Sequence, residues 1–131
     1  MSNHIHLIVS AQEGYQLSAI FRDFKSFTAK EFLKEINTGK ESRKDWLLHQ
    51  FQYFAGKHKR SQKHMIWQHD NHPILLWSAK VIKQKVNYIH LNPVRAGLVG
   101  NPSDWLYSSA IDYEGEKGLL EVIVLDAVYT L

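Results

Sequence analysis

Residues 88–99 constrain the fold of this chain more than any other segment, because a proline and a glycine follow a helical pattern there. The pattern covers residues 79–87, and Pro93 disfavours the α conformation at Asn92, so we expect the helix to stop at that residue. Gly97 then permits a tight turn. The segment therefore predicts a helix that ends abruptly and turns back.

This helix carries a phenol and an amide on one side. Ile82, Val86 and Ile89 share its apolar face on a helical wheel. Tyr88 lies about 100° around the helix from Ile89, at the border of the polar face. Asn92 follows Tyr88 one turn later on the same side. We therefore expect both polar side chains together near the C-terminal end of the helix.

Composition limits the class of protein. The chain has 131 residues, 44% of them hydrophobic, which suits one small globular domain. It has no cysteine, which excludes disulfides and thiolate metal sites and favours a cytoplasmic protein. No apolar run is long enough to span a bilayer, so we expect no membrane partner. The net charge of +3 permits a polyanionic partner.

The N-terminal residues 3–9 have the pattern of a strand, with His4 and His6 on one face and apolar side chains on the other. Two imidazoles on one strand face can bind a divalent metal. The alternative is that both histidines simply face solvent. The spacing alone leaves the two interpretations open.

Other segments predict two more helices and two short strands. Apolar residues at helical spacing indicate a helix over 16–36, and a second helix lies between residues 45 and 56. Residues 65–76 resemble a strand or a bent hairpin, and 119–125 a short C-terminal strand. We expect no inter-domain linker.

Basic side chains on helix backs and in one run after the second helix are candidates for DNA phosphates. They are Arg22, Lys25, Lys30, Lys57, Lys59, Arg60, Lys63 and Arg95. Trp67 follows the basic run, and a cationic track beside an aromatic ring suits single-stranded nucleic acid. The alternative is a solvated basic surface with a tryptophan in the core.

Four motifs together resemble the HUH single-tyrosine transposases, in particular the branch of REP-associated tyrosine transposases. They span residues 3–7 (Asn-His-Ile-His-Leu), 22–28, 88–98 and 104–109. The resemblance covers residues 2 to about 113. It implies an α+β fold, in which helices pack against a ferredoxin-like antiparallel sheet. It also implies metal-assisted cleavage of single-stranded DNA, including hairpins and palindromes.

By that resemblance, His4, His6 and Asn92 are metal ligands and Tyr88 is the nucleophile that forms a 5′-phosphotyrosine. Mg²⁺ or Mn²⁺ is the expected metal, because the chemistry is on phosphate and no thiolate is present. We therefore expect residues 1–131 to form a single transposase-like catalytic domain. Two alternatives are an inactive DNA-binding remnant of the same family and a metal-free structural or interaction protein.

In one respect the chain departs from the family pattern. Family members carry a strand, a helix and another strand before the histidine strand, whereas Met1 here falls almost on the motif. We therefore expect a sheet that is incomplete at the N-terminus, as in a truncated chain. Apolar surface left uncovered by the missing strands favours self-association, so we expect a tendency to form a homodimer.

Overall fold

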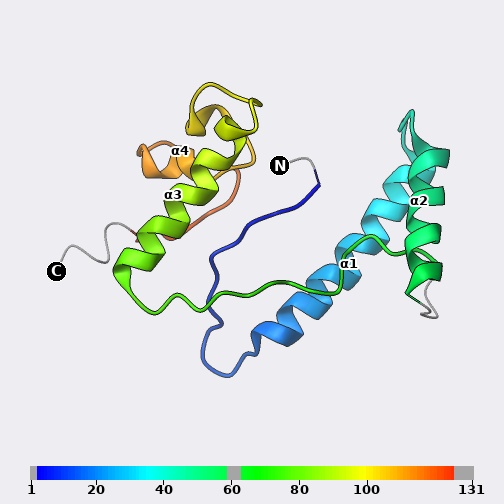
Figure 1. The fold of residues 1–131 in the computed structure, drawn as a ribbon, viewed down its shortest axis with the longest axis horizontal. Coiled ribbons are helices and arrows are strands. Elements are labelled where there is room, and N and C mark those ends of the chain that lie inside the picture. Colours follow the sequence, from blue (N-terminus) through cyan, green and yellow to red (C-terminus); the bar gives the residue numbers. More distant parts are fainter. Residues whose placement is uncertain (1–2, 59–62, 126–131) are drawn as a thin grey trace. The chain divides into compact units, whose positions relative to one another are not determined.

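The computed structural model describes residues 3–58 and 63–125 and contains helices joined by extended and turn segments (Figure 1). In chain order the elements are α1 (Leu17–Thr38), α2 (Lys44–Lys57), α3 (Ala79–Arg95), the 3-10 turn η1 (Pro102–Asp104) and α4 (Ala110–Tyr113). None of the helices in these two ranges is long and apolar enough to cross a membrane.

Contacts within the chain define two compact units. Unit 1 consists of Met1–Val9 and Ile74–Leu131, and it contains α3, η1 and α4. Unit 2 consists of Ser10–Pro73 and contains α1 and α2. The segment with the two N-terminal histidines and the helix with Tyr88 therefore belong to the same unit.

In unit 2, Trp67 anchors the segment after α2 to the side of α1. Its ring packs against Phe24 and Phe32, with ring centroids 5.8 Å and 6.3 Å away. Its indole N–H donates a hydrogen bond to the Thr28 hydroxyl at 2.8 Å. One turn earlier on α1, Lys25 Nζ donates to the Gln68 carbonyl oxygen at 2.6 Å. The apolar stripe predicted for α1 thus finds an aromatic partner in its own unit.

In unit 1, α3 has a defined signal at each end. The Ser78 hydroxyl accepts a hydrogen bond from the Val81 amide at 3.3 Å, which caps the N-terminus. At the C-terminus, the Gly97 amide bonds the Val94 carbonyl at 2.9 Å, and the next amide bonds the Pro93 carbonyl at 3.0 Å. This pair of bonds is a Schellman motif, and Gly97 adopts the left-handed φ of 68° that it requires.

Our expectation that the helix stops at Asn92 was wrong. The helix continues through Pro93 to Arg95, and the Pro93 side chain is buried. A proline inside a helix removes one backbone hydrogen bond, but here it lies only one turn from the end. Gly97, with its positive φ, sets the end of the helix instead.

Gly97→Ala should destabilise unit 1 by about 1–2 kcal/mol, because alanine resists a positive φ. A Cβ at Gly97 meets no atom within 4 Å, so the cost is conformational rather than steric. Urea unfolding followed by circular dichroism measures it. Gly100→Ala is the matched control three residues away, since a Cβ there makes only an ordinary contact at 3.7 Å. Equal stability of the two variants would contradict the turn's role.

The back of α3 packs against the short elements that follow it. His90 Nε2 and the Ser109 hydroxyl lie 3.1 Å apart, within hydrogen-bond distance. The His90 ring also meets the Tyr113 ring edge-on, with 4.8 Å between centroids. These contacts join α3 to α4, and η1 contacts both helices. They fix the back of α3 while Tyr88, two residues before His90, remains on its outer side.

The prediction of a ferredoxin-like antiparallel sheet was wrong, because no residue in 3–58 or 63–125 belongs to a β-strand. Residues 3–9 are extended, and the described backbone hydrogen bonds give them no partner strand. Residues 65–76 and 119–125, also expected as strands, form no ladder either. An alternating pattern predicts an extended segment, but a strand exists only where a second backbone pairs with it.

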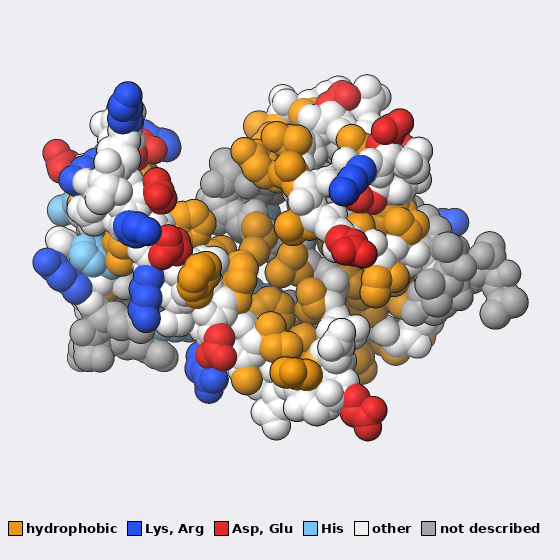
Figure 2. All heavy atoms as spheres, turned by 180° about the vertical axis from the view of Figure 1, so that it is seen from behind, with side chains coloured by type: hydrophobic (Ala, Val, Ile, Leu, Met, Phe, Trp, Pro, Cys, Tyr) orange, Lys and Arg blue, Asp and Glu red, His pale blue; other side chains and the backbone are white. Residues whose placement is uncertain are grey.

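Few apolar side chains are buried in the described ranges, and they are small: Ala55, Val86, Pro93 and Ala110. Many large ones remain exposed, including Phe27 at 66% and Trp77 at 76%. Figure 2 shows orange hydrophobic side chains reaching the surface on the face that it displays. Exposed apolar surface of this kind is what self-association would bury, and the homodimer stays a prediction.

Candidate active site

In unit 1, the His6 ring lies between the rings of His4 and Tyr88 and contacts both. The two imidazoles meet edge-on, with 4.9 Å between ring centroids. The His6 ring in turn meets the Tyr88 ring edge-on at 5.5 Å. The extended N-terminal segment therefore runs past α3 where Tyr88 projects, and residues 82 positions apart in the chain come into contact.

Both imidazoles are suited to metal binding. His4 Nδ1 lies 2.7 Å from Asn3 Oδ1, so a proton on Nδ1 is held by the amide and Nε2 keeps its lone pair. The pKa of His6 lies below its usual value. The larger cause is partial burial of the imidazole, and the second is charge repulsion from the nearby His4. At neutral pH this favours the uncharged imidazole, which is the form that binds metals.

The predicted metal site needs a third ligand besides His4 and His6. Within residues 3–58 and 63–125, no three His, Cys, Asp or Glu side chains lie close enough to share an ion. Asn92 is half-buried on α3, one turn beyond Tyr88. An amide carbonyl oxygen is an acceptable ligand for a hard cation, so two imidazoles plus this amide fit a divalent ion chemically.

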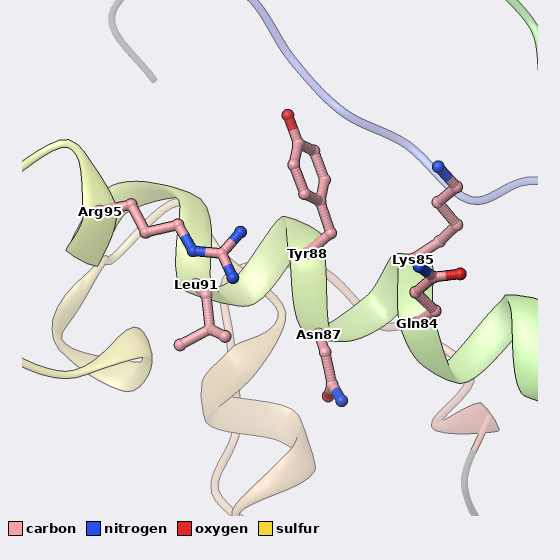
Figure 3. Close-up of a pocket in the computed structure, with 6 residues that line it drawn as sticks. All are labelled: Gln84, Lys85, Asn87, Tyr88, Leu91 and Arg95. Carbon is pink, nitrogen blue, oxygen red and sulfur yellow. The ribbon is translucent and has the colours of Figure 1, made fainter.

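Tyr88 itself is accessible. It is 44% exposed, and the Lys85 ammonium lies 6.0 Å from the centroid of its ring. The two residues line a hollow of about 380 Å³ on α3, shown in Figure 3. The other lining residues are Gln84, Asn87, Leu91 and Arg95. In Figure 3 the Tyr88 hydroxyl points away from the axis of α3.

Comparison with known proteins identifies the family. The family model described as "Transposase IS200 like" matches residues 1–69, which is more than half of the 131-residue chain. The chain belongs to the IS200-like transposase family. The family resemblance inferred from the sequence motifs is therefore confirmed. No curated protein and no solved structure matches the chain.

As an IS200-like transposase, the protein is an enzyme of DNA transposition. The matched residues include His4 and His6 and end before α3, so they do not include Tyr88 or Asn92. Evidence for these two side chains comes instead from the 88–98 motif and from the ring contact between His6 and Tyr88. The metal and nucleophile roles of the four residues stay predictions.

The candidate DNA-binding residues of the transposase divide between the two units. Arg95 lies in unit 1, in the same hollow as Tyr88. The described candidates of unit 2 are Arg22, Lys25, Lys30, Lys57, Lys63 and Trp67. Lys59 and Arg60 lie outside the described residues. Of the candidates within the described ranges, Arg95 is therefore the one that lines the hollow with the tyrosine.

Three of the unit 2 candidates already have partners within their own unit. Trp67 packs on α1 and donates to Thr28, and Lys25 donates to a backbone carbonyl. Arg22 is exposed and pairs with Asp23 at 2.8 Å, which holds the pKa of that carboxyl below its usual value. Lys30, Lys57 and Lys63 are exposed. These last three are the most accessible to a phosphate.

The helical pattern of the sequence already places two of the lining residues on the Tyr88 side of the helix. Gln84 and Lys85 lie four and three residues before the tyrosine, spacings that make side chains neighbours on a helix surface. Asn87 and Leu91 also line the hollow but were not singled out from the sequence. Neither is charged, so a search for phosphate-binding cations does not find them.

Proposed function

We propose that this transposase cleaves and rejoins single-stranded DNA with Tyr88 as the nucleophile and with a divalent metal ion. The observation that supports this proposal most strongly is the edge-on contact between the His6 and Tyr88 rings at 5.5 Å. It brings a candidate metal ligand next to an accessible phenol in one compact unit. His6 and Tyr88 both belong to unit 1, so their contact does not involve unit 2.

Cleavage by this mechanism requires both the Tyr88 phenol and the metal ion. A tyrosine is a poor nucleophile at its ordinary pKa near ~10, so it needs activation and a polarised phosphate. His4, His6 and Asn92 would hold Mg²⁺ or Mn²⁺, which supplies a Lewis acid for the phosphate oxygens when bound. The ammonium of Lys85, beside the Tyr88 ring, adds positive charge where the phosphate approaches.

Cleavage then follows a balanced exchange of ester bonds. The Tyr88 oxygen attacks the scissile phosphorus and loses its proton to water. The new bond joins phosphorus to the phenol oxygen, and the bond to the 3′ oxygen breaks. The released 3′ oxygen takes up a proton, leaving a free 3′-hydroxyl and a 5′-phosphotyrosine. Attack by the same or another 3′-hydroxyl reverses the step and transfers the strand without an external energy source.

The substrate we propose is a single strand that contains a hairpin. The motif of residues 88–98 supports membership of the REP-associated branch, for which hairpin and palindromic DNA are the expected substrates. Arg95, which lines the same hollow as Tyr88, and the exposed lysines of unit 2 supply positive charge. Affinity that depends on phosphate contacts falls as salt rises.

A direct test mixes the purified chain and Mg²⁺ with labelled hairpin-forming oligonucleotides whose loop and flanking sequences are randomised. We expect a covalent protein–DNA adduct that survives denaturing electrophoresis, and weaker binding in higher salt. Blunt duplexes of the same composition are the control and should bind less tightly and give no adduct. Equal binding of plain duplex, or no adduct from any hairpin in the pool, would refute the proposal.

A further inference from the structure

The surface around Tyr88 on α3 carries amide, cationic and apolar side chains at helical spacing. Gln84, Leu91 and Arg95 lie four residues before, three after and seven after the tyrosine, and all of them line the same hollow (Figure 3). Seven residues correspond to about 11 Å along a helix, or two turns. The hollow therefore reaches well beyond the single phosphate that Tyr88 would attack.

The side chains of the hollow match the parts of a nucleotide. Lys85 and Arg95 are positively charged and lie on either side of Tyr88 along the helix. No carboxylate lines the hollow, and none of the described ion pairs involves either cation. Leu91, 37% exposed, offers an apolar surface between the tyrosine and the arginine.

Two amides complete the hollow. Gln84 and Asn87 each carry a carbonyl acceptor and an NH₂ donor, so either side chain can form two hydrogen bonds with the edge of one base. In a duplex the pairing edge is occupied, whereas an unpaired base exposes it to side chains. Phosphate contacts fix the position of a strand, and contacts with base edges determine which sequence fits.

We propose that this hollow is a nucleotide subsite that selects the base flanking the scissile phosphate. Arg95 and Lys85 bind backbone phosphates, Leu91 supports the sugar or base, and the amides of Gln84 and Asn87 read the base edge. This inference rests on the proposed function, because it takes the strand at Tyr88 to be single-stranded DNA. It adds a source of sequence preference within the chain itself.

Binding without cleavage isolates the subsite. The test uses the full chain with Tyr88→Phe in the presence of chelator, and fluorescein-labelled dA10, dC10 and dT10 as probes. Fluorescence anisotropy gives the affinity for each decamer over a range of salt. Circular dichroism verifies that every variant keeps its helix content.

The variants should distinguish phosphate binding from base recognition. Arg95→Gln should weaken binding of all three decamers by a similar factor and reduce the salt slope by about 0.7, the value for one phosphate contact on a single strand. Gln84→Ala and Asn87→Ala should leave the salt slope unchanged. At least one of them should alter the affinity ratio between two decamers by about fivefold or more, the lower limit for a bidentate amide–base pair.

Lys83→Gln is the control, because Lys83 is exposed on the same helix, carries a positive charge and does not line the hollow. If it weakens binding as much as Arg95→Gln, the effect is general charge and the subsite is refuted. Unchanged affinity ratios in both amide variants refute it too, as does a chain that binds no decamer. A wild-type chain that forms no adduct but shows amide-dependent ratios would refute the proposed cleavage and retain the subsite.

Discussion

Tyr88→Phe should abolish the covalent adduct with hairpin DNA and leave binding and folding intact. The substitution removes only the hydroxyl, which in Figure 3 points away from the axis of α3. The ring is retained, so its edge-on contact with His6 and its place beside Lys85 should persist. Without a phenol oxygen, no phosphotyrosine can form. Denaturing electrophoresis of labelled DNA measures the loss, which should be complete within detection.

The matched control for this variant is Tyr107→Phe. Tyr107 also belongs to unit 1 and is 76% exposed, but its described ring contact is with Trp105 at 5.8 Å rather than with a histidine. An exposed phenol without a neighbouring imidazole should be dispensable, so this variant should form the adduct at the wild-type rate. An adduct that persists in Tyr88→Phe would mean that another residue is the nucleophile.

His4→Ala and His6→Ala should each remove nicking in Mg²⁺, and chelation of the wild-type chain should do the same. Loss of a direct metal ligand should cost more than the roughly 10–100-fold that follows when a ligand merely loses its hydrogen-bond partner. Adding back Mg²⁺ or Mn²⁺ after chelation should restore the wild-type chain. Neither alanine variant should recover in the same metal concentration.

His49→Ala provides the control, since His49 is an exposed histidine on α2 in unit 2. Its removal should change neither nicking nor metal dependence. Single-turnover nicking rates with excess protein separate chemistry from DNA binding in all three variants. Full activity of both N-terminal variants, or of the wild-type chain in chelator, would show that the imidazoles hold no metal needed for cleavage.

Local features of the sequence determined the helices and the family. The apolar stripe over residues 16–36 predicted α1, found at Leu17–Thr38, and Gly97 predicted the turn that ends α3. Both signals depend on side-chain spacing or on the φ angle of one residue, which are properties of a short segment. The histidine motif and the 88–98 motif together resembled the transposase family, and the family match over residues 1–69 bears that resemblance out.

Tertiary structure alone decided whether extended segments pair and which side chains meet. Alternation in residues 3–9 predicted a strand, but the segment is extended and unpaired, because pairing depends on a distant segment that the pattern does not encode. Pro93 predicted a helix stop, but α3 continues to Arg95 with the Pro93 side chain buried. The contact between His6 and Tyr88 joins residues 82 positions apart, and no local spacing specifies it. Local propensity is a property of the segment, whereas pairing, burial and site assembly depend on what the rest of the chain places beside it.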